Sequence, residues 1–232
     1  MNRNDQVQEN QRRGFLKQVA TGAAVLGVGM LSAPRNLSAD SMPSTNSSEA
    51  DEWFRKIEGK HRMVFDVTQP HETMPFAWPK VFLMSNAATG TPETDCNAVV
   101  IFRHNAIPYA LGNDLWAKYK FGEMFKINDA ENKAPATSNP FWQPKEGTYK
   151  APGLGVVKIG INELQNDGVM FGVCDVALTV NSALAAMGMK GDPEAIKKEW
   201  VAGLLPGIQL MPSGIWAIGR AQEHGCSYCF AG

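Results

Sequence analysis

The sequence lacks an excess of charge of either sign. Its 22 lysine and arginine residues nearly balance 23 aspartate and glutamate residues over 232 positions, and the formal net charge is −1. Binding to a nucleic-acid backbone draws on a basic surface, so we expect no nucleic-acid partner. The sequence also has no Gly-x-Gly-x-x-Gly motif and no phosphate-binding loop, and we expect no cofactor.

Two further absences narrow the chemistry. No Gly-x-Ser-x-Gly motif is present, which excludes the common serine-hydrolase arrangement. Phe230 follows Cys229 at the position where attachment of a c-type haem requires histidine. The chain has only four cysteines, and what they do depends on the compartment in which the protein works.

The first 39 residues have the build of an export signal. Arg12 and Arg13 precede an uncharged apolar stretch, Val19 to Leu31, which is shorter than the roughly 20 residues of a membrane-spanning helix. The arginine pair resembles a twin-arginine signal, and we predict cleavage after Ala39. We therefore expect a periplasmic protein that meets the membrane only through this signal during export; the alternative is that residues 1–39 stay as an uncleaved anchor.

The chain after the signal is predicted to form a tether and one domain. Residues 1–39 hold five basic and two acidic residues, so the remainder carries 17 basic and 21 acidic residues and is net acidic. Residues 40–52 are mostly polar and predict a flexible tether. Residues 53–232 suffice for one globular domain.

Within this domain, strand-like runs alternate with helical stretches. This pattern predicts an α/β domain with a mostly parallel sheet. The expected strands are residues 62–68, 98–103, 169–173 and 208–211, and the expected helices are residues 77–88, 156–168, 176–188, 193–204 and 213–223. Asp192 and Ser213 are expected to cap the last two helices.

Two segments carry more specific expectations. Along the helix that ends at Gly188, the residues Val176, Ala177, Val180, Leu184 and Met187 fall on one face, which we expect to lie against the core. An irregular insertion at about 129–153 is expected to form a lid, a binding loop or a subunit contact. Its Phe141-Trp142 pair is expected to plug the core rather than to bind a ligand.

Cys174 is the first candidate for chemistry. It ends a predicted buried strand and begins a helix, where unpaired amides and the helix dipole favour a thiolate. Asp175 places a negative charge beside it, and cysteine is also a common core residue. His104 ends the strand before it and is a second candidate, or a histidine at the edge of the core. Asp66 has no partner that is visible in the sequence.

Cys226 and Cys229 allow three interpretations. They could form a disulfide, locally or with Cys96 or Cys174, or act as a resolving pair for Cys174. They could also join His224 in a zinc or copper site, although the absence of a second cluster makes this the weakest interpretation.

The second half of the chain resembles the DsrE/DsrF-like family. The resemblance rests on Val173-Cys174, Met187-Gly188, Leu204 to Ile208, Pro212 to Trp216, and Ala221-Gln222 with Gly225. It implies a flavodoxin-like three-layer α/β sandwich, a homo-oligomer, and a persulfide on Cys174 that is exchanged with a sulfur-relay or redox partner protein. The insertion, Asp175 and the Cys226/Cys229 pair depart from the family pattern.

These observations leave three functions open. The first is sulfur or thiol redox chemistry at Cys174, with the activity class uncertain. The second is a non-catalytic binding or assembly module whose cysteines are structural. The third is a metal-binding protein that uses the C-terminal histidine and cysteines.

Overall fold

The structure, a computed structural model, describes residues 47–232 and is built around a five-stranded sheet. The strand order is β6-β5-β2-β1-β7, and all four pairings are parallel. The strands are β1 (His61–Val67), β2 (Cys96–Phe102), β5 (Met170–Cys174), β6 (Ile208–Met211) and β7 (Ser227–Phe230). A separate antiparallel hairpin joins β3 (Lys150–Ala151) and β4 (Gly155–Val156).

The central strands are buried over most of their length because both of their faces are covered. Successive side chains of a strand point to opposite faces. Accordingly, Val64 and Val99 belong to one buried cluster, whereas Phe65 and Val100 belong to the other. This burial on both faces is the usual environment of a parallel sheet.

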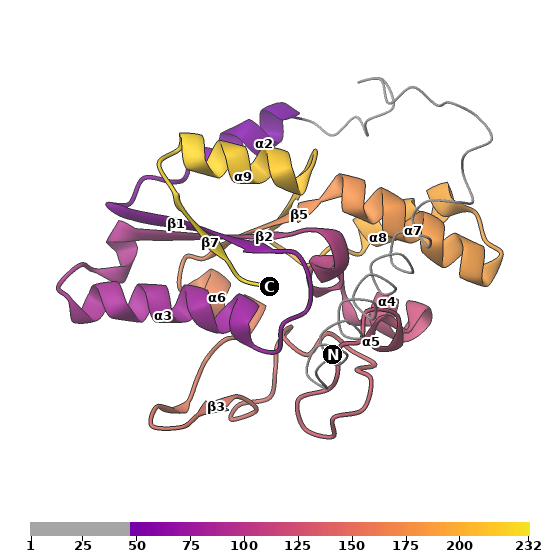
Figure 1. Cartoon of the computed structure of the whole chain (residues 1–232), viewed down its shortest axis with the longest axis horizontal. Coiled ribbons are helices and arrows are strands. Elements are labelled where there is room, and N and C mark those ends of the chain that lie inside the picture. The colour runs from indigo at the N-terminus through magenta and orange to yellow at the C-terminus, as the bar shows by residue number, and fades with distance from the viewer. Residues whose placement is uncertain (1–46) are drawn as a thin grey trace, which may run out of the picture. The chain divides into compact units, whose positions relative to one another are not determined.

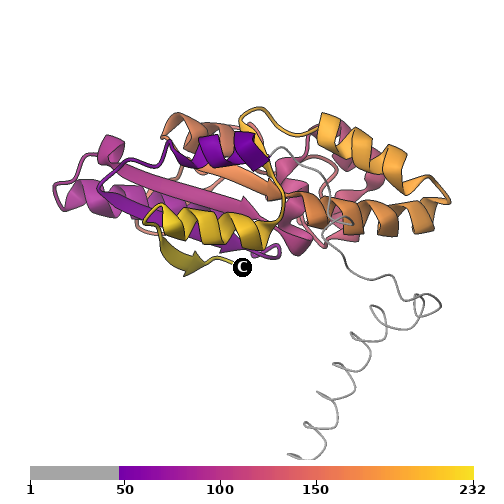
Figure 2. The ribbon, with the colours of Figure 1, turned by 90° about the horizontal axis from the view of Figure 1, so that it is seen from above.

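Helices form a layer on each side of the sheet. In Figure 1, α2 and α9 lie on one side and α3 and α6 on the other, while α7 and α8 extend side by side beyond the carboxyl ends of the strands, as Figure 2 also shows. The helices are α2 (Ser47–Phe54), α3 (Met74–Ala88), α4 (Asn113–Tyr119), α5 (Phe121–Met124), α6 (Ile161–Asn166), α7 (Asp175–Met189), α8 (Pro193–Ala202) and α9 (Gly214–Glu223), with the 3₁₀ helices η2 (Glu93–Asp95) and η3 (His104–Ala110). None of the helices within residues 47–232 is both long and apolar enough to cross a membrane.

The predicted fold class is confirmed: the domain is a three-layer α/β sandwich of the flavodoxin-like kind with a parallel sheet. Counted along the chain, the five strands have the order 4-3-2-1-5, whereas flavodoxin itself has 2-1-3-4-5. The predicted caps are also confirmed. The Asp192 side chain accepts the Glu194 N–H, and the Ser213 hydroxyl accepts the Trp216 N–H.

Several expected boundaries are wrong. Residues 47–52, assigned to the tether, begin α2, because Ala50, Trp53 and Phe54 share one helical face and are buried. The helix expected over 156–168 is confined to α6, since Val156 belongs to the β3–β4 hairpin. α7 continues past Gly188 to Met189. The signal with Arg12 and Arg13 and the first part of the tether lie outside the described residues.

The apolar face predicted for α7 lies against the core only at its start, where Ala177 is buried and Val176 packs on the core cluster. Val180, Leu184 and Met187 are 48%, 45% and 63% exposed. Leu178 and Ala185, on the other side of the helix, are the buried ones. The expected burial of Phe141 is confirmed, because its ring lies in the core cluster.

Candidate functional site

Cys174 lies at the carboxyl end of β5 and is the N-cap residue of α7. Its Sγ accepts the backbone N–H of Ala177 at 3.3 Å. The sulfur therefore lies at the positive end of a 15-residue helix. Only 6% of the residue is exposed, so the position combines shielding from water with a group that stabilises negative charge.

An ion pair that the sequence did not reveal lies at the same edge of the sheet. Arg103, which follows β2, donates from Nε to Oδ1 of Asp66 at 2.6 Å and from Nη2 to Oδ2 at 2.8 Å. The Tyr228 hydroxyl, from β7, donates to the same Oδ2 at 2.8 Å. Asp66 therefore has two partners, contrary to the expectation of an isolated carboxylate. The three residues come from adjacent strands, as Figure 1 shows for β2, β1 and β7.

Arg103 is held from two sides. The hydrogen bond to Asp66 is the main cause that raises the pKa of Arg103. The N-terminus of α9 packs directly on this side chain: a Cβ on Gly214 would lie 2.6 Å from the Cβ of Arg103. A permanently charged guanidinium is thus held in place by Asp66 and α9.

Asp175 does not weaken this site as the sequence suggested. Its carboxylate is buried and points to α8, where Lys197 Nζ lies 2.9 Å from each of its oxygens. The negative charge expected beside the thiol is therefore balanced by Lys197. Lys197 is visible in the sequence, one turn into the next helix, but the spacing does not show that its side chain points to Asp175.

His104 lies at the predicted edge but is not joined to Cys174. It is exposed, has a left-handed backbone with φ of +52°, and starts η3. Its carbonyl oxygen accepts a long hydrogen bond from Asn181 on α7. Within residues 47–232, its side chain has no hydrogen bond to the thiol.

The expectation that Cys226 and Cys229 act as a pair is wrong. All four cysteines are unpaired thiols. Cys226 packs in the cluster beneath α2 and α9, whereas Cys229 packs against the cluster on the opposite face of the sheet. Their odd spacing in extended chain separates them in this way, so they form neither a disulfide nor a resolving pair. Burial raises the pKa of Cys226 to about 11 and also raises the pKa of Cys229.

His224 does not complete a metal site with these cysteines. Its ring stacks on Phe54 at 6.0 Å between centroids, and its carbonyl oxygen accepts a hydrogen bond from Arg62. In the described part of the chain, no group of three or more histidine, cysteine, aspartate or glutamate side chains is placed to hold a metal ion. The metal-binding interpretation therefore has no support from geometry.

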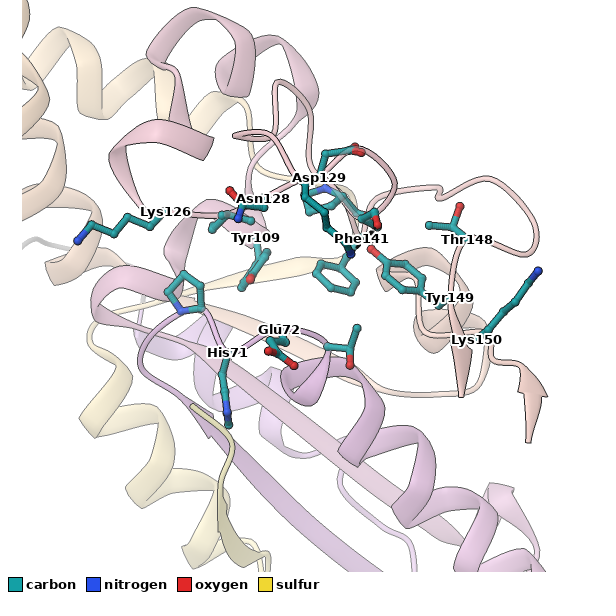
Figure 3. Close-up of a pocket in the computed structure, with 16 residues that line it drawn as sticks. His71, Glu72, Tyr109, Lys126, Asn128, Asp129, Phe141, Thr148, Tyr149 and Lys150 are labelled. Carbon is teal, nitrogen blue, oxygen red and sulfur yellow. Dashed lines mark hydrogen bonds between the residues drawn. The ribbon is translucent and has the colours of Figure 1, made fainter. Parts of the chain in front are cut away.

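A cleft of about 680 Å³ opens at a second place on this side of the sheet. Figure 3 shows it between the loop after β1, which carries His71 and Glu72, and the insertion, which carries Phe141 and Tyr149. Cys174 does not line it. The thiol site and the cleft are therefore separate features.

Comparisons with known proteins add little to this geometry. No protein-family model and no curated protein matches the chain. Among solved structures, the chain is similar to a protein of unknown function from Methanobacterium thermoautotrophicum, with 15% identity over 74% of this chain and 99% of that chain and a TM-score of 0.37. This similarity is too low to support an argument, and the DsrE/DsrF-like resemblance stays a prediction.

Proposed function

We propose that the protein carries out sulfur or thiol redox chemistry at Cys174, as a persulfide carrier of the DsrE-like kind. The observation that carries this proposal is the sulfur at the N-terminus of α7, which accepts the Ala177 N–H. Unpaired amides and the positive end of a helix dipole favour a thiolate, which is the reactive form of cysteine. No other thiol among residues 47–232 caps a helix in this way.

The proposed step is a transfer of one sulfane sulfur. The Cys174 thiolate attacks the terminal sulfur of a donor persulfide, R–S–SH, and forms a new S–S bond. The bond between the two donor sulfurs breaks, R–S⁻ leaves with its electron pair, and the proton stays on the transferred sulfur. The step needs no external oxidant because the oxidation state of the sulfane sulfur passes unchanged to Cys174.

The proposal includes a cellular location and a partner protein. An exported, periplasmic location follows from the arginine pair Arg12-Arg13 and the apolar stretch after it. A sulfur-relay or redox protein would then deliver or remove the sulfur.

Mass spectrometry after exposure to inorganic polysulfide tests the proposal. The full chain is expected to gain one sulfur atom on Cys174, and the Cys174→Ser variant is expected to gain none there. Cys229→Ser is the matched control, since Cys229 is the more exposed thiol, and it should leave the reaction at Cys174 intact. Persulfide on Cys229 with Cys174 unmodified would refute the proposed role.

A second candidate function, an assembly module, is favoured by the exposed face of α7. Val180, Leu184 and Met187 are exposed on one face, and residues 176–189 contain no charged side chain. Single exposed apolar residues are ordinary, but a contiguous apolar stripe marks an interaction site.

We propose a second copy of this chain as the partner of this stripe. Two uncharged helices related by a two-fold axis can pack antiparallel without contact between like charges. Lys190, which follows α7, would then lie near the start of the second copy's α7 and far from the Lys190 of that copy. The stripe is thus complementary to itself.

Light scattering on the full chain tests this assembly. Leu184→Asp is expected to shift the protein from dimer or higher oligomer to monomer. Val81→Asp, at an equally exposed apolar position on α3, is the control and should leave the mass unchanged. A monomeric parent protein, or an unchanged mass for Leu184→Asp, would contradict the proposal.

A further inference from the structure

The sheet ends in a strand whose outer edge is open. β7 is the last strand of the order β6-β5-β2-β1-β7 and pairs with β1. Among residues 47–232, no helix or strand other than β1 packs extensively against it, and Figure 2 shows its arrow at the margin of the ribbon. The other outer strand, β6, is contacted by α2 and α9.

The outward backbone groups of β7 belong to Tyr228 and Phe230. Ala231 donates its N–H to the carbonyl oxygen of Asp66, on β1, at 2.9 Å. Residues two apart in a strand direct their N–H and C=O groups to the same side, so Cys229 faces β1 as well. Tyr228 and Phe230 therefore direct their backbone donors and acceptors away from the sheet.

This edge has none of the usual protection against strand addition. Exposed edges normally carry charged side chains, proline or a bulge. Residues 225–232 contain no charged residue and no proline, and the register between β1 and β7 runs without a bulge. Tyr228 and Phe230 are 47% and 52% exposed. The edge is thus apolar, regular and accessible.

We propose that the open edge of β7 pairs with β7 of a second copy of this chain. The two strands run antiparallel about a two-fold axis at Cys229 and join the two sheets into one. The contact is separate from the α7 stripe and does not depend on the chemistry proposed for Cys174.

Pairing centred on Cys229 gives a partner to every outward group of the strand. Tyr228 then lies opposite Phe230 of the second copy, and Phe230 lies opposite Tyr228 of that copy. Each of these is a hydrogen-bonded pair, in which both residues exchange N–H and C=O groups. The facing aromatic side chains add contact on one side of the sheet, and the bond from the Tyr228 hydroxyl to Asp66 holds one ring of each pair in place.

Charge and size determine when this contact persists. The two uncharged edges meet without like charges, and the charge of Asp66 beside them is balanced by Arg103. One pair of four-residue strands is much smaller than a stable interface of roughly 800 Å² per partner. The contact is therefore short-lived while the thiols are reduced, and the mass of the reduced protein depends on α7 rather than on β7.

A disulfide between the two copies of Cys229 captures the contact. The axis places these residues in a non-hydrogen-bonded pair, with Cα atoms about 4.5 Å apart, which is within the range of disulfides. The thiol already lies at the open edge, because its Sγ donates to the outward carbonyl oxygen of Phe230 at 3.7 Å.

Oxidised glutathione, a small disulfide, supplies the oxidant for this test. One Cys229 thiolate attacks it and releases a glutathione thiolate, and the second Cys229 thiolate attacks the mixed disulfide and releases the other. Two protein thiols are oxidised, one small disulfide is reduced, and the two protons pass to glutathione. Non-reducing electrophoresis and peptide mass spectrometry of the full chain are expected to show a covalent dimer linked through Cys229. No dimer, or a dimer linked only through another cysteine, would overturn the proposal.

Two variants distinguish edge pairing from random collision of thiols. Ser227→Cys combined with Cys229→Ser moves the thiol two residues along the same face, to a more exposed position. The proposed axis separates the two copies of this position by about 13 Å along the strands, too far for a disulfide, so no dimer is expected.

Phe230→Pro removes an outward N–H from each copy and leaves the pairing with β1 intact, because proline is tolerated at an edge. It should slow dimer formation at least about 10-fold, while iodoacetamide still modifies Cys229 at the rate of the parent protein. Ile215→Ser, at an exposed apolar position on α9, is the control and should leave dimer formation unchanged. Equal dimer yield from the thiol at position 227, or an unchanged rate for Phe230→Pro, would refute the pairing.

Discussion

Replacing Asp66 with asparagine removes the negative charge that joins β1 to its neighbours. The carboxylate accepts three hydrogen bonds, two from Arg103 at 2.6 and 2.8 Å and one from Tyr228 at 2.8 Å. Asparagine offers a single acceptor oxygen, and its NH₂ group would face a donor. The change therefore leaves the Arg103 guanidinium without its counter-charge and breaks at least one of the three bonds.

The expected loss is large but below the value for a fully buried pair. Removing one partner of a buried ion pair costs about 3–5 kcal/mol. The Asp66 side chain is 3% exposed but that of Arg103 is 25% exposed, so water recovers part of the hydration of the guanidinium. We therefore expect Asp66→Asn to lower the free energy of unfolding by about 2–3 kcal/mol. Tyr228→Phe, which removes one hydrogen bond, should cost about 1 kcal/mol.

Urea unfolding, followed by circular dichroism, measures these losses. Glu52→Gln is the control, because the Glu52–Arg55 pair is exposed, with side chains 69% and 71% accessible, and should cost less than about 0.5 kcal/mol. A loss for Asp66→Asn that equals the loss for Glu52→Gln would refute the argument that this ion pair stabilises the sheet.

Two further predictions concern stability. Gly122→Ala should destabilise the fold by about 1–3 kcal/mol, because its Cβ would lie 2.3 Å from the carbonyl oxygen of Ala136. Gly219→Ala lies inside α9 with no atom within 4 Å of the new Cβ, and it should stabilise the fold by up to about 1 kcal/mol. Equal thermal midpoints for the two variants would contradict both expectations. The Cys226 pKa is raised from 9.0 to about 11 by burial, so the unfolded chain loses this proton first, and up to about 2.7 kcal/mol of stability is lost as the pH rises from 9 to 11. Cys226→Ala should therefore show a weaker fall in unfolding free energy over that interval, and parallel curves would count against the buried thiol as the cause.

The sequence predicted the features that depend on local chemistry. The apolar runs at 98–103 and 169–173 identify strands buried on both faces, and Asp192 and Ser213 identify helix starts, because a cap bonds to amides only two or three residues away. Cys174 was likewise placed correctly at a strand end and a helix start. Each of these features is decided within about one turn of chain.

The features that the sequence did not reveal depend on distant neighbours. Periodicity predicted that α7 is a helix with an apolar stripe, but which side faces the core depends on η3, α8 and α9, which contact it. The Asp66–Arg103 pair joins residues 37 positions apart, and Tyr228 comes from 162 positions away. β7 was missed because Cys226 and Cys229 suggested a motif, whereas the four residues that follow Cys226 form a strand.

The position of β7 has a consequence for the order of folding. β1 is made early in synthesis, yet one of its two neighbours pairs with it through residues 227–230, which are made more than 160 residues later. Until then, the edge of β1 that pairs with β7 is open, and another chain could join it. A pairing of such long sequence separation is slow to form. During that interval, this edge of β1 stays open to pairing with another chain.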